Sequence, residues 1–249
     1  MTAHGPSDAA SRYLSAVLHD ARRDLGRDLP LGTTVVASAE REGSTAAVAY
    51  PLGEQTVIWC APTVAPLLSS LIRPDALTVD EFVAAGELLG GTFEGTGRHM
   101  VLAGEPAVLS DRRYGPVELH RDVASDRELL AAFIGSCSDD DLDEAELDFD
   151  ELDAAMLVLV DAAGSIASYA SARPWALDAD FDDIAVITHP DHRGCRLGAV
   201  VVAEFSRRRQ QAGRMMFYSH GMENVGSSRV AETVGFEAVA TVAAISFSG

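Results

Sequence analysis

The chain contains no lysine, and this absence excludes one large class of nucleotide-binding sites. All 19 of its basic residues are arginine. A P-loop requires a lysine directly after its last glycine, so this sequence cannot form one. The dinucleotide-binding fingerprint G-x-G-x-x-G is absent as well. Both of these common phosphate-binding motifs are therefore excluded.

Cysteine is also scarce, which argues against a disulfide framework or a zinc knuckle. The three cysteines, Cys60, Cys137 and Cys195, are odd in number and have unrelated spacings. His189 and His192 flank a Pro-Asp turn, but the sequence offers no third ligand beside them. We therefore expect reduced cysteines and no metal site.

Long apolar segments and clusters of positive charge are missing too. No window approaches the roughly 20 apolar residues of a membrane helix, and the first residues lack a basic segment followed by an apolar one. The 38 acidic residues leave a net charge of -19, which disfavours binding to a phosphate backbone. With 249 residues and 47% apolar content, we expect a soluble cytoplasmic protein of two domains that binds neither membrane nor nucleic acid.

The first hundred residues have the pattern of a small α/β unit. The predicted elements are a helix over 8–25, a hairpin of strands 35–39 and 46–50, a strand over 56–62, a helix after a capping box of Thr78 and Glu81, and a strand over 99–104. Turn-forming residues gather at 104–116. We therefore divide the chain into an N-terminal accessory domain, 1–112, and a second domain, 113–249.

The second domain alternates strands and helices, which predicts a mixed α/β (α+β) fold. The expected elements are a strand over 117–119, a helix with a capping box of Ser125 and Glu128, an acidic segment, a hairpin turning at 162–164, a strand over 184–188, a helix over 197–212, a strand over 215–219, a helix from Asn224 to Gly235, and a strand over 238–247. These elements can form one sheet flanked by helices.

The stretch "THPDHRGCRLGAVV", residues 188–201, predicts an anion site. A strand that passes through a glycine-containing turn into a helix points several unpaired backbone amides at one spot, where the helix dipole favours phosphate oxygens. Gly194 and Gly198 carry no Cβ, so the main chain there can approach a ligand closely.

This stretch resembles the acyl-CoA pyrophosphate loop of the GNAT superfamily of N-acyltransferases. Arg193, Gly198 and Ala199 match the family pattern, whereas Arg196 stands at the central glycine position. Downstream, "ENVGSSRVAETVGF", residues 223–236, is similar to the family's second cofactor segment. The resemblance covers roughly 117–247. It implies a GNAT-like, mostly antiparallel sheet, and it leaves open whether residues 1–112 form an unrelated cap or a degenerate second copy of the fold.

The resemblance also implies a set of residues that bind acetyl-CoA as co-substrate. The backbone of the fourth strand would pair with the pantetheine arm, the amides of the loop would hold the diphosphate, and the next helix would contact the arm. These residues are Val186, Ile187 and Thr188; Arg193, Gly194, Arg196, Leu197, Gly198 and Ala199; and Asn224 with one of Ser227 or Ser228.

The chemistry implied is direct attack of a primary amine on the thioester, aided by a base and an acid. The family's usual acid, a tyrosine four residues before the Gly-Phe pair, is replaced by Ala231. Tyr218 and His220 are the candidate acids, and Asp183, with Asp182 or Glu118 as alternatives, is the candidate base.

The acidic segment and the missing tyrosine each leave two interpretations open. Residues 139–153 hold ten of the acids and could attract a cationic amine acceptor, or they could form a solvated charged loop. The chain could be an N-acetyltransferase acting on a small molecule or peptide, or a non-catalytic acyl-CoA-binding sensor or interaction module. The sequence does not define the acceptor, the acyl length or the oligomeric state.

Overall fold

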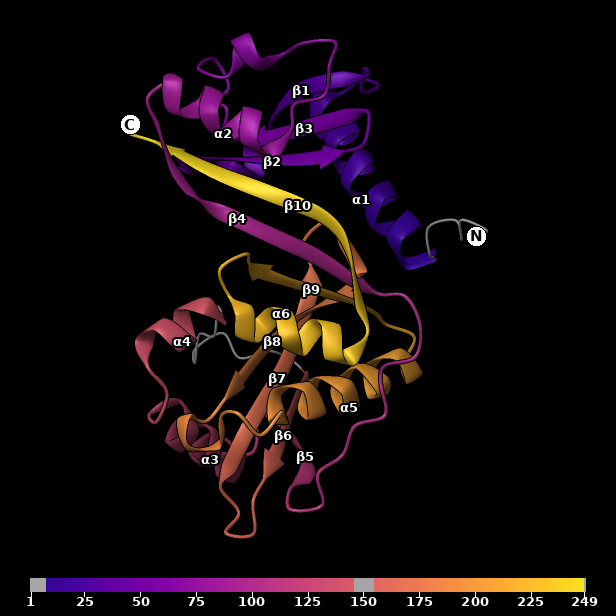
Figure 1. Cartoon of the computed structure of the whole chain (residues 1–249), viewed down its shortest axis with the longest axis vertical. Helices are drawn as coiled ribbons and strands as arrows, with labels where there is room; N and C mark the ends of the chain where they lie inside the picture. Colours follow the sequence, from indigo (N-terminus) through magenta and orange to yellow (C-terminus); the bar gives the residue numbers. More distant parts are fainter. Residues whose placement is uncertain (1–7, 146–154, 249) are drawn as a thin grey trace. The chain divides into compact units, whose positions relative to one another are not determined.

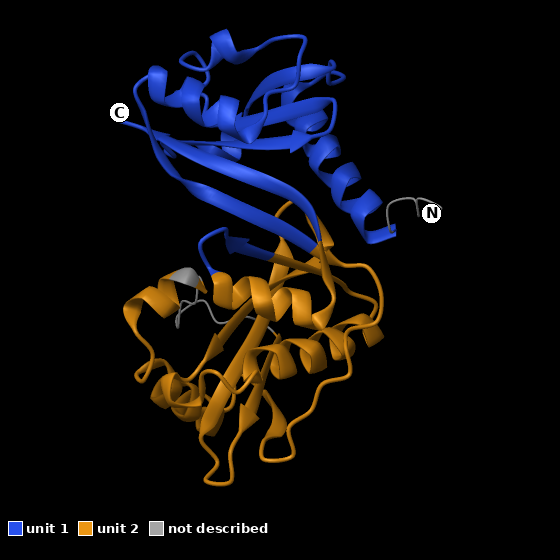
Figure 2. Cartoon of the chain, in the orientation of Figure 1, with its two compact units in different colours: residues 1–100, 219–224, 238–249 blue, residues 101–218, 225–237 orange. Residues whose placement is uncertain are grey.

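The computed structural model describes residues 8–145 and 155–248, which form two compact units (Figures 1 and 2). Unit 1 comprises residues 1–100, 219–224 and 238–249, and unit 2 comprises residues 101–218 and 225–237. Each unit is built from segments distant in the sequence, because the last strands of the chain return to unit 1. The division at residue 112 remains a prediction.

Unit 1 is a sheet covered by helices, with strand order β1-β3-β2-β10-β4. Its elements, some of which extend into unit 2, are α1 (Asp8–Leu25), β1 (Gly32–Ala37), β2 (Ala46–Leu52), β3 (Gln55–Cys60), α2 (Val79–Leu88), β4 (Gly91–Leu102) and β10 (Phe236–Phe247), with short 3-10 turns at Ala39–Arg41 and Ser69–Leu71. The predicted helices are confirmed. Thr78 and Glu81 form the capping box of α2.

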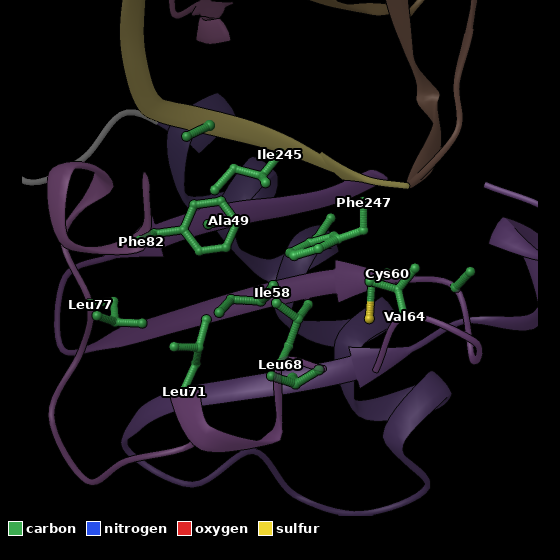
Figure 3. Packing of buried hydrophobic residues seen from close by; sticks show 14 residues of the cluster. Ala49, Ile58, Cys60, Val64, Leu68, Leu71, Leu77, Phe82, Ile245 and Phe247 are labelled. Atoms are coloured by element: carbon green, nitrogen blue, oxygen red, sulfur yellow. The ribbon is translucent and has the colours of Figure 1, made fainter. Parts of the chain in front are cut away.

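The core of unit 1 lies between α2 and the sheet (Figure 3). Phe82 of α2 is fully buried against Ile58 of β3 and Ile245 of β10. Gly86 permits this packing, because a Cβ there would lie 2.2 Å from the Cδ1 atom of Ile245. The final strand of the chain therefore completes the core of the N-terminal segment.

The predicted hairpin of strands 35–39 and 46–50 is wrong. β1 pairs in parallel with β3, and β2 forms its antiparallel hairpin with β3 instead. The tight turn of this hairpin lies at Gly53, whose φ of 75° favours glycine. The longer "EREGST" connection between β1 and β2 contains a 3-10 turn instead. A parallel neighbour requires a long connection, and residues 38–54 provide it.

Unit 2 contains the strand order β9-β8-β7-β6-β5. Its elements are β5 (Gly115–Leu119), α3 (Ala124–Ile134), α4 (Asp139–Glu144), β6 (Ala155–Val160), β7 (Ile166–Trp175), β8 (Asp178–Thr188), a 3-10 turn at Pro190–His192, α5 (Leu197–Gln211), β9 (Met215–Gly221, whose last residues belong to unit 1) and α6 (Val225–Val234). Strands β5 to β8 are antiparallel, and β9 is parallel to β8.

Two faces of this sheet are buried by different helices. Phe133 of α3 packs in one apolar cluster with Val158 and Tyr169, while α5 lies against β6, β7 and β8. Because strand side chains alternate, Leu157 next to Val158 points to the opposite face, where it is fully buried. The mixed α/β sheet predicted for this half is confirmed.

The capping box predicted at Ser125 and Glu128 is wrong. The helix α3 begins two residues earlier, at Ala124, with Val123 in place of Ser125 as N-cap and no side-chain cap. The carboxylate of Asp126 instead accepts a hydrogen bond from the backbone amide of His120 at 2.9 Å. None of the helices in the described ranges combines the length and apolar character that crossing a bilayer requires.

Candidate functional site

Strand β8 has one edge that is only partly covered. On one side it pairs with β7 along its length, up to Ser168↔Thr188. On the other side, its parallel pairing with β9 ends at Asp183↔Phe217. Among the described residues of unit 2, Ile184 and the β8 residues after it have no partner in β9. On this side the second half of β8 therefore has an unpaired edge, its open edge.

The backbone groups of Val186 point to this open edge. The amide of His189 donates to the carbonyl of Ala167 at 3.0 Å. Bonded and non-bonded pairs alternate along an antiparallel ladder, so Ile187 also bonds to β7, whereas Val186 and Thr188 direct their N–H and C=O groups away from it. The resemblance implies that this strand pairs its backbone with a pantetheine arm. The N–H and C=O groups of Val186 point to the side of the strand on which such pairing would occur.

The loop after β8 depends on two left-handed backbone positions. Gly194 has φ 75°, and Arg196, the N-cap of α5, has φ 62° and ψ 17°. Arg196 is the one non-glycine residue with positive φ in the described ranges. This conformation costs a residue with a Cβ about 1 kcal/mol. Arg196, at the central glycine position of the loop pattern, thus adopts a backbone geometry that favours glycine.

Several backbone amides at the start of α5 have no protein acceptor. The amide of Arg193 donates to the carbonyl of Pro190 at 3.3 Å, and that of Val200 donates to Arg196 at 3.1 Å. Between them, the amides of residues 194–199 donate to no protein acceptor in the part of the chain that the structure describes. Of the expected donors, the amide of Arg193 thus has a protein acceptor, whereas those of Gly194, Arg196, Leu197, Gly198 and Ala199 have none in the described residues. With the dipole of a 15-residue helix behind them, they form a site suited to a phosphate.

Gly198 brings the start of α5 close to β8. A Cβ at this position would lie 3.2 Å from both Oγ1 of Thr188 and Cγ2 of Val230. Leu197 and Ala199 beside it are buried. The free amides are therefore held on a rigid helix end that packs directly on the open-edged strand.

The side chain of Arg193 joins this loop to the acidic helix α4. Its Nε donates to the carbonyl of Thr188 at 3.3 Å, and its Nη2 lies 2.6 Å from Oδ2 of Asp141. Ser138, the N-cap of α4, also bonds to Asp141 in a capping box. The hydroxyl of Ser138 and then Arg193 lower the pKa of the Asp141 carboxyl. Part of the acidic segment is thus ordered against the loop; residues 146–154 lie outside the described residues.

Tyr218 lies one residue beyond the last pair of β8 and β9. Its side chain is 1% exposed, and its hydroxyl is 2.7 Å from Oγ of Ser227 in the first turn of α6. Ala231, at the position where the resemblance expects a tyrosine, is fully buried one turn further along the same helix. The phenol of Tyr218, on β9, therefore contacts α6 one turn before Ala231, the position at which the resemblance expects a tyrosine.

The three candidate bases differ in their surroundings. Asp182 is 2% exposed, and its oxygens are held by Arg209 at 2.5 Å and Arg214 at 2.7 Å. Glu118 is paired with Arg208 at 2.6 Å. Asp183 is the last β8 residue paired with β9, and its Oδ2 lies 3.9 Å from Nε of Arg173. Asp182 is thus held in a buried ion pair, and the role of Asp183 as base stays a prediction.

His220 and Asn224 belong to unit 1. His220 is 8% exposed, and its Nδ1 is 2.8 Å from the carbonyl oxygen of Gly221. Since a carbonyl only accepts, Nδ1 carries the proton in the neutral ring and Nε2 carries the lone pair. The amide of Asn224 donates to the same Gly221 carbonyl, directly before α6.

Ser228 and His192 each have a hydrogen-bond partner within the protein. The hydroxyl of Ser228 donates to Glu232 one turn along α6, at 3.2 Å. The ring nitrogen of His192 lies 3.1 Å from the hydroxyl of Tyr114. Cys195 is exposed and has no disulfide. Within the described ranges, no group of three or more His, Cys, Asp or Glu side chains is arranged to hold a metal ion.

Solved structures share this arrangement of strands and helices. A GCN5-related N-acetyltransferase from Kribbella flavida superposes with a TM-score of 0.57 at 15% identity, covering 98% of this chain and 97% of that chain. One from Sphaerobacter thermophilus gives 0.54 at 12% identity, covering 96% and 93%. The chain has the GNAT fold. No family model and no curated protein matches its sequence, so the likeness is one of fold.

Sequence reasoning missed three contacts around the loop and α6. The capping box of Ser138 and Asp141 was present in the sequence as S-x-x-D, but the surrounding acids obscured it. The contact of Asp141 with Arg193 spans 52 residues and leaves no local pattern. The contact of Tyr218 with Ser227 depends likewise on how β9 and α6 pack.

Proposed function

We propose that the protein is an acyl-CoA-dependent N-acyltransferase, in its simplest form an acetyltransferase acting on a primary amine. The observation that carries the proposal is the run of available amides at residues 194–199, beside the open edge of β8, in a chain with the GNAT fold. These donors fit a diphosphate, which needs several N–H groups and no metal.

The residues that would hold acyl-CoA follow from this geometry. The amides of Gly194 and Arg196, with those of the first turn of α5, would bind the diphosphate. Val186 would offer its N–H and C=O groups to the amides of the pantetheine arm, as a neighbouring strand does. Ser228 and Asn224 remain proposed contacts to the arm.

The acid that protonates the departing thiolate would be Tyr218. Its hydroxyl lies on the α6 side of β9 at the end of the β8–β9 pairing, and a phenol in reach of a developing anion can both stabilise it and release a proton to it. His220 is the alternative acid. Asp183 would take the proton from the attacking amine, directly or through water.

The acceptor would be an amine, and the acidic residues of α4 support a cationic one. Asp139 and Asp140 lie in the first turn of α4, whose Asp141 contacts the proposed cofactor loop. Negative charge beside an acceptor site raises the local concentration of cations. A rise in KM with salt for a polyamine, but not for a neutral amine, would support this acceptor class.

A thiol-release assay with acetyl-CoA and pooled amines tests the activity. Release above the rate of spontaneous hydrolysis, lost in Tyr218→Phe and kept in Tyr114→Phe, is the expected result. Binding of CoA without turnover by any amine would instead favour the second candidate, a non-catalytic acyl-CoA-binding sensor, for which the replacement of the usual acid by Ala231 speaks. Absence of CoA binding would contradict both.

A further inference from the structure

The phenol of Tyr218 sits in apolar surroundings with a hydroxyl from α6 directly on its oxygen. Its ring centroid is 5.3 Å from that of Phe236, and its side chain is 1% exposed. The hydroxyl of Ser227 lies 2.7 Å from the phenolic oxygen, so these two oxygens form a short hydrogen bond between β9 and α6.

Such a pair matters most at the moment when the phenol has lost its proton. A buried phenolate is costly unless a donor faces it. A serine hydroxyl rotates freely about its C–O bond, so Ser227 can accept from the neutral phenol and donate to the phenolate without moving its oxygen. Ser228, the next residue, instead donates to Glu232 and faces a different partner.

The transfer step uses Tyr218 as the acid and a separate base for the amine proton. The amine nitrogen forms a bond to the acyl carbon, the carbon–sulfur bond breaks, and the thiolate takes the proton of Tyr218 to give the free thiol. The resulting phenolate accepts a hydrogen bond from Ser227. Solvent then returns a proton to the phenolate, while the base releases to solvent the proton that it took from the amine.

We propose that Ser227 is the positioning residue of this acid: its hydroxyl fixes the phenol of Tyr218 and stabilises the phenolate formed as the thiolate departs. This role rests on the proposed function and replaces the cofactor-arm contact expected for Ser227 from the sequence. It makes Ser227 a determinant of the rate of transfer and not of the affinity for acyl-CoA.

The titration of Tyr218 tests the contact without any knowledge of the acceptor. Protein labelled with 3-fluorotyrosine contains five reporters, and Tyr218→Phe assigns the fluorine resonance of interest. Ser227→Ala should raise the pH midpoint of this resonance by about one unit, because the phenolate loses a donor. Ser227→Cys, a weaker donor of similar size, should shift it in the same direction, Ser227→Thr should restore it, and the matched control Ser228→Ala should leave it unchanged.

Activity provides the second measurement. Ser227→Ala should lower kcat for thiol release about ten-fold and move its alkaline limb to higher pH, with KM for acetyl-CoA unchanged. An unshifted fluorine midpoint, or a raised KM with kcat and its pH profile intact, would overturn the role of Ser227 while leaving CoA binding in place. Failure of the wild-type chain to bind CoA would overturn the proposed function, whatever the fluorine titration gives.

Discussion

The buried histidine of unit 1 should make the stability of the protein depend on pH. His99 of β4 is 9% exposed, its Nδ1 lies 2.8 Å from the hydroxyl of Tyr13, and its ring is in edge contact with Tyr50. Burial lowers the pKa of His99 from 6.5 to about 4. The folded state therefore excludes a proton that the unfolded state binds, so stability is present above pH 6.5 and is lost as the pH falls toward 4.

The size of the effect follows from the shift in pKa. Each pKa unit corresponds to about 1.4 kcal/mol, so the step between pH 7.5 and pH 4.5 amounts to about 2.5 kcal/mol. Carboxylates titrate in the same range, so the informative quantity is the difference between wild type and His99→Gln, which lacks this step. The variant should be less stable at pH 7.5, and the gap should close by about 2.5 kcal/mol at pH 4.5.

Urea denaturation followed by circular dichroism at both pH values measures this gap. His19→Gln, on the exposed side of α1, is the matched control and should run parallel to the wild type. If the difference between wild type and His99→Gln stays constant to within about 0.5 kcal/mol across this range, His99 is not held neutral by burial and the reasoning fails.

Three further predictions concern unit 2. Arg196→Gly should raise the free energy of unfolding by about 1 kcal/mol and retain CoA binding, because glycine relieves the left-handed backbone; a lower melting temperature would contradict this. Asp182→Asn should cost about 3 kcal/mol in urea denaturation, since two arginines lose a buried carboxylate, and a loss below about 0.5 kcal/mol would mean that the pair is not structural. Asp141→Asn should cost about 0.5–1 kcal/mol through loss of its ion pair with Arg193 and a weaker capping box with Ser138, whereas the matched Asp140→Asn should cost less; equal melting temperatures would refute the contribution of these contacts.

The part of the fold that the sequence predicted depends on local patterns. The helix α5 and the turn before it have residues that signal their own conformation, such as Gly194 and Gly213 at its two ends. The partner of β1 could not be predicted in this way, because two strands adjacent in sequence satisfy the same alternation whether or not they pair. The insertion of β10 into the sheet of unit 1 depends on contacts between residues about 200 positions apart.

The candidate site likewise has parts that a local sequence pattern predicts and parts that depend on contacts between distant elements. The loop and its unbonded amides were predictable because a backbone motif lies within one stretch of sequence, whereas the binding of a diphosphate by these amides stays a prediction. The side chains that perform chemistry come from different elements, so the pairing of Tyr218 with Ser227 required the packed structure. The left-handed backbone of Arg196 is a local feature that the sequence did not predict, because nothing in the residue type indicates it.

Isothermal titration of CoA into Gly194→Ala and Gly213→Ala tests the central claim most directly. Both glycines have positive φ, 75° and 81°, and a Cβ would meet nothing within 4 Å at either position. Both variants should therefore lose a similar stability of about 1 kcal/mol. Only Gly194→Ala, which disturbs the amides at the start of α5, should weaken CoA binding, by about ten-fold or more. Equal affinity of the two variants for CoA would contradict a diphosphate site at this loop.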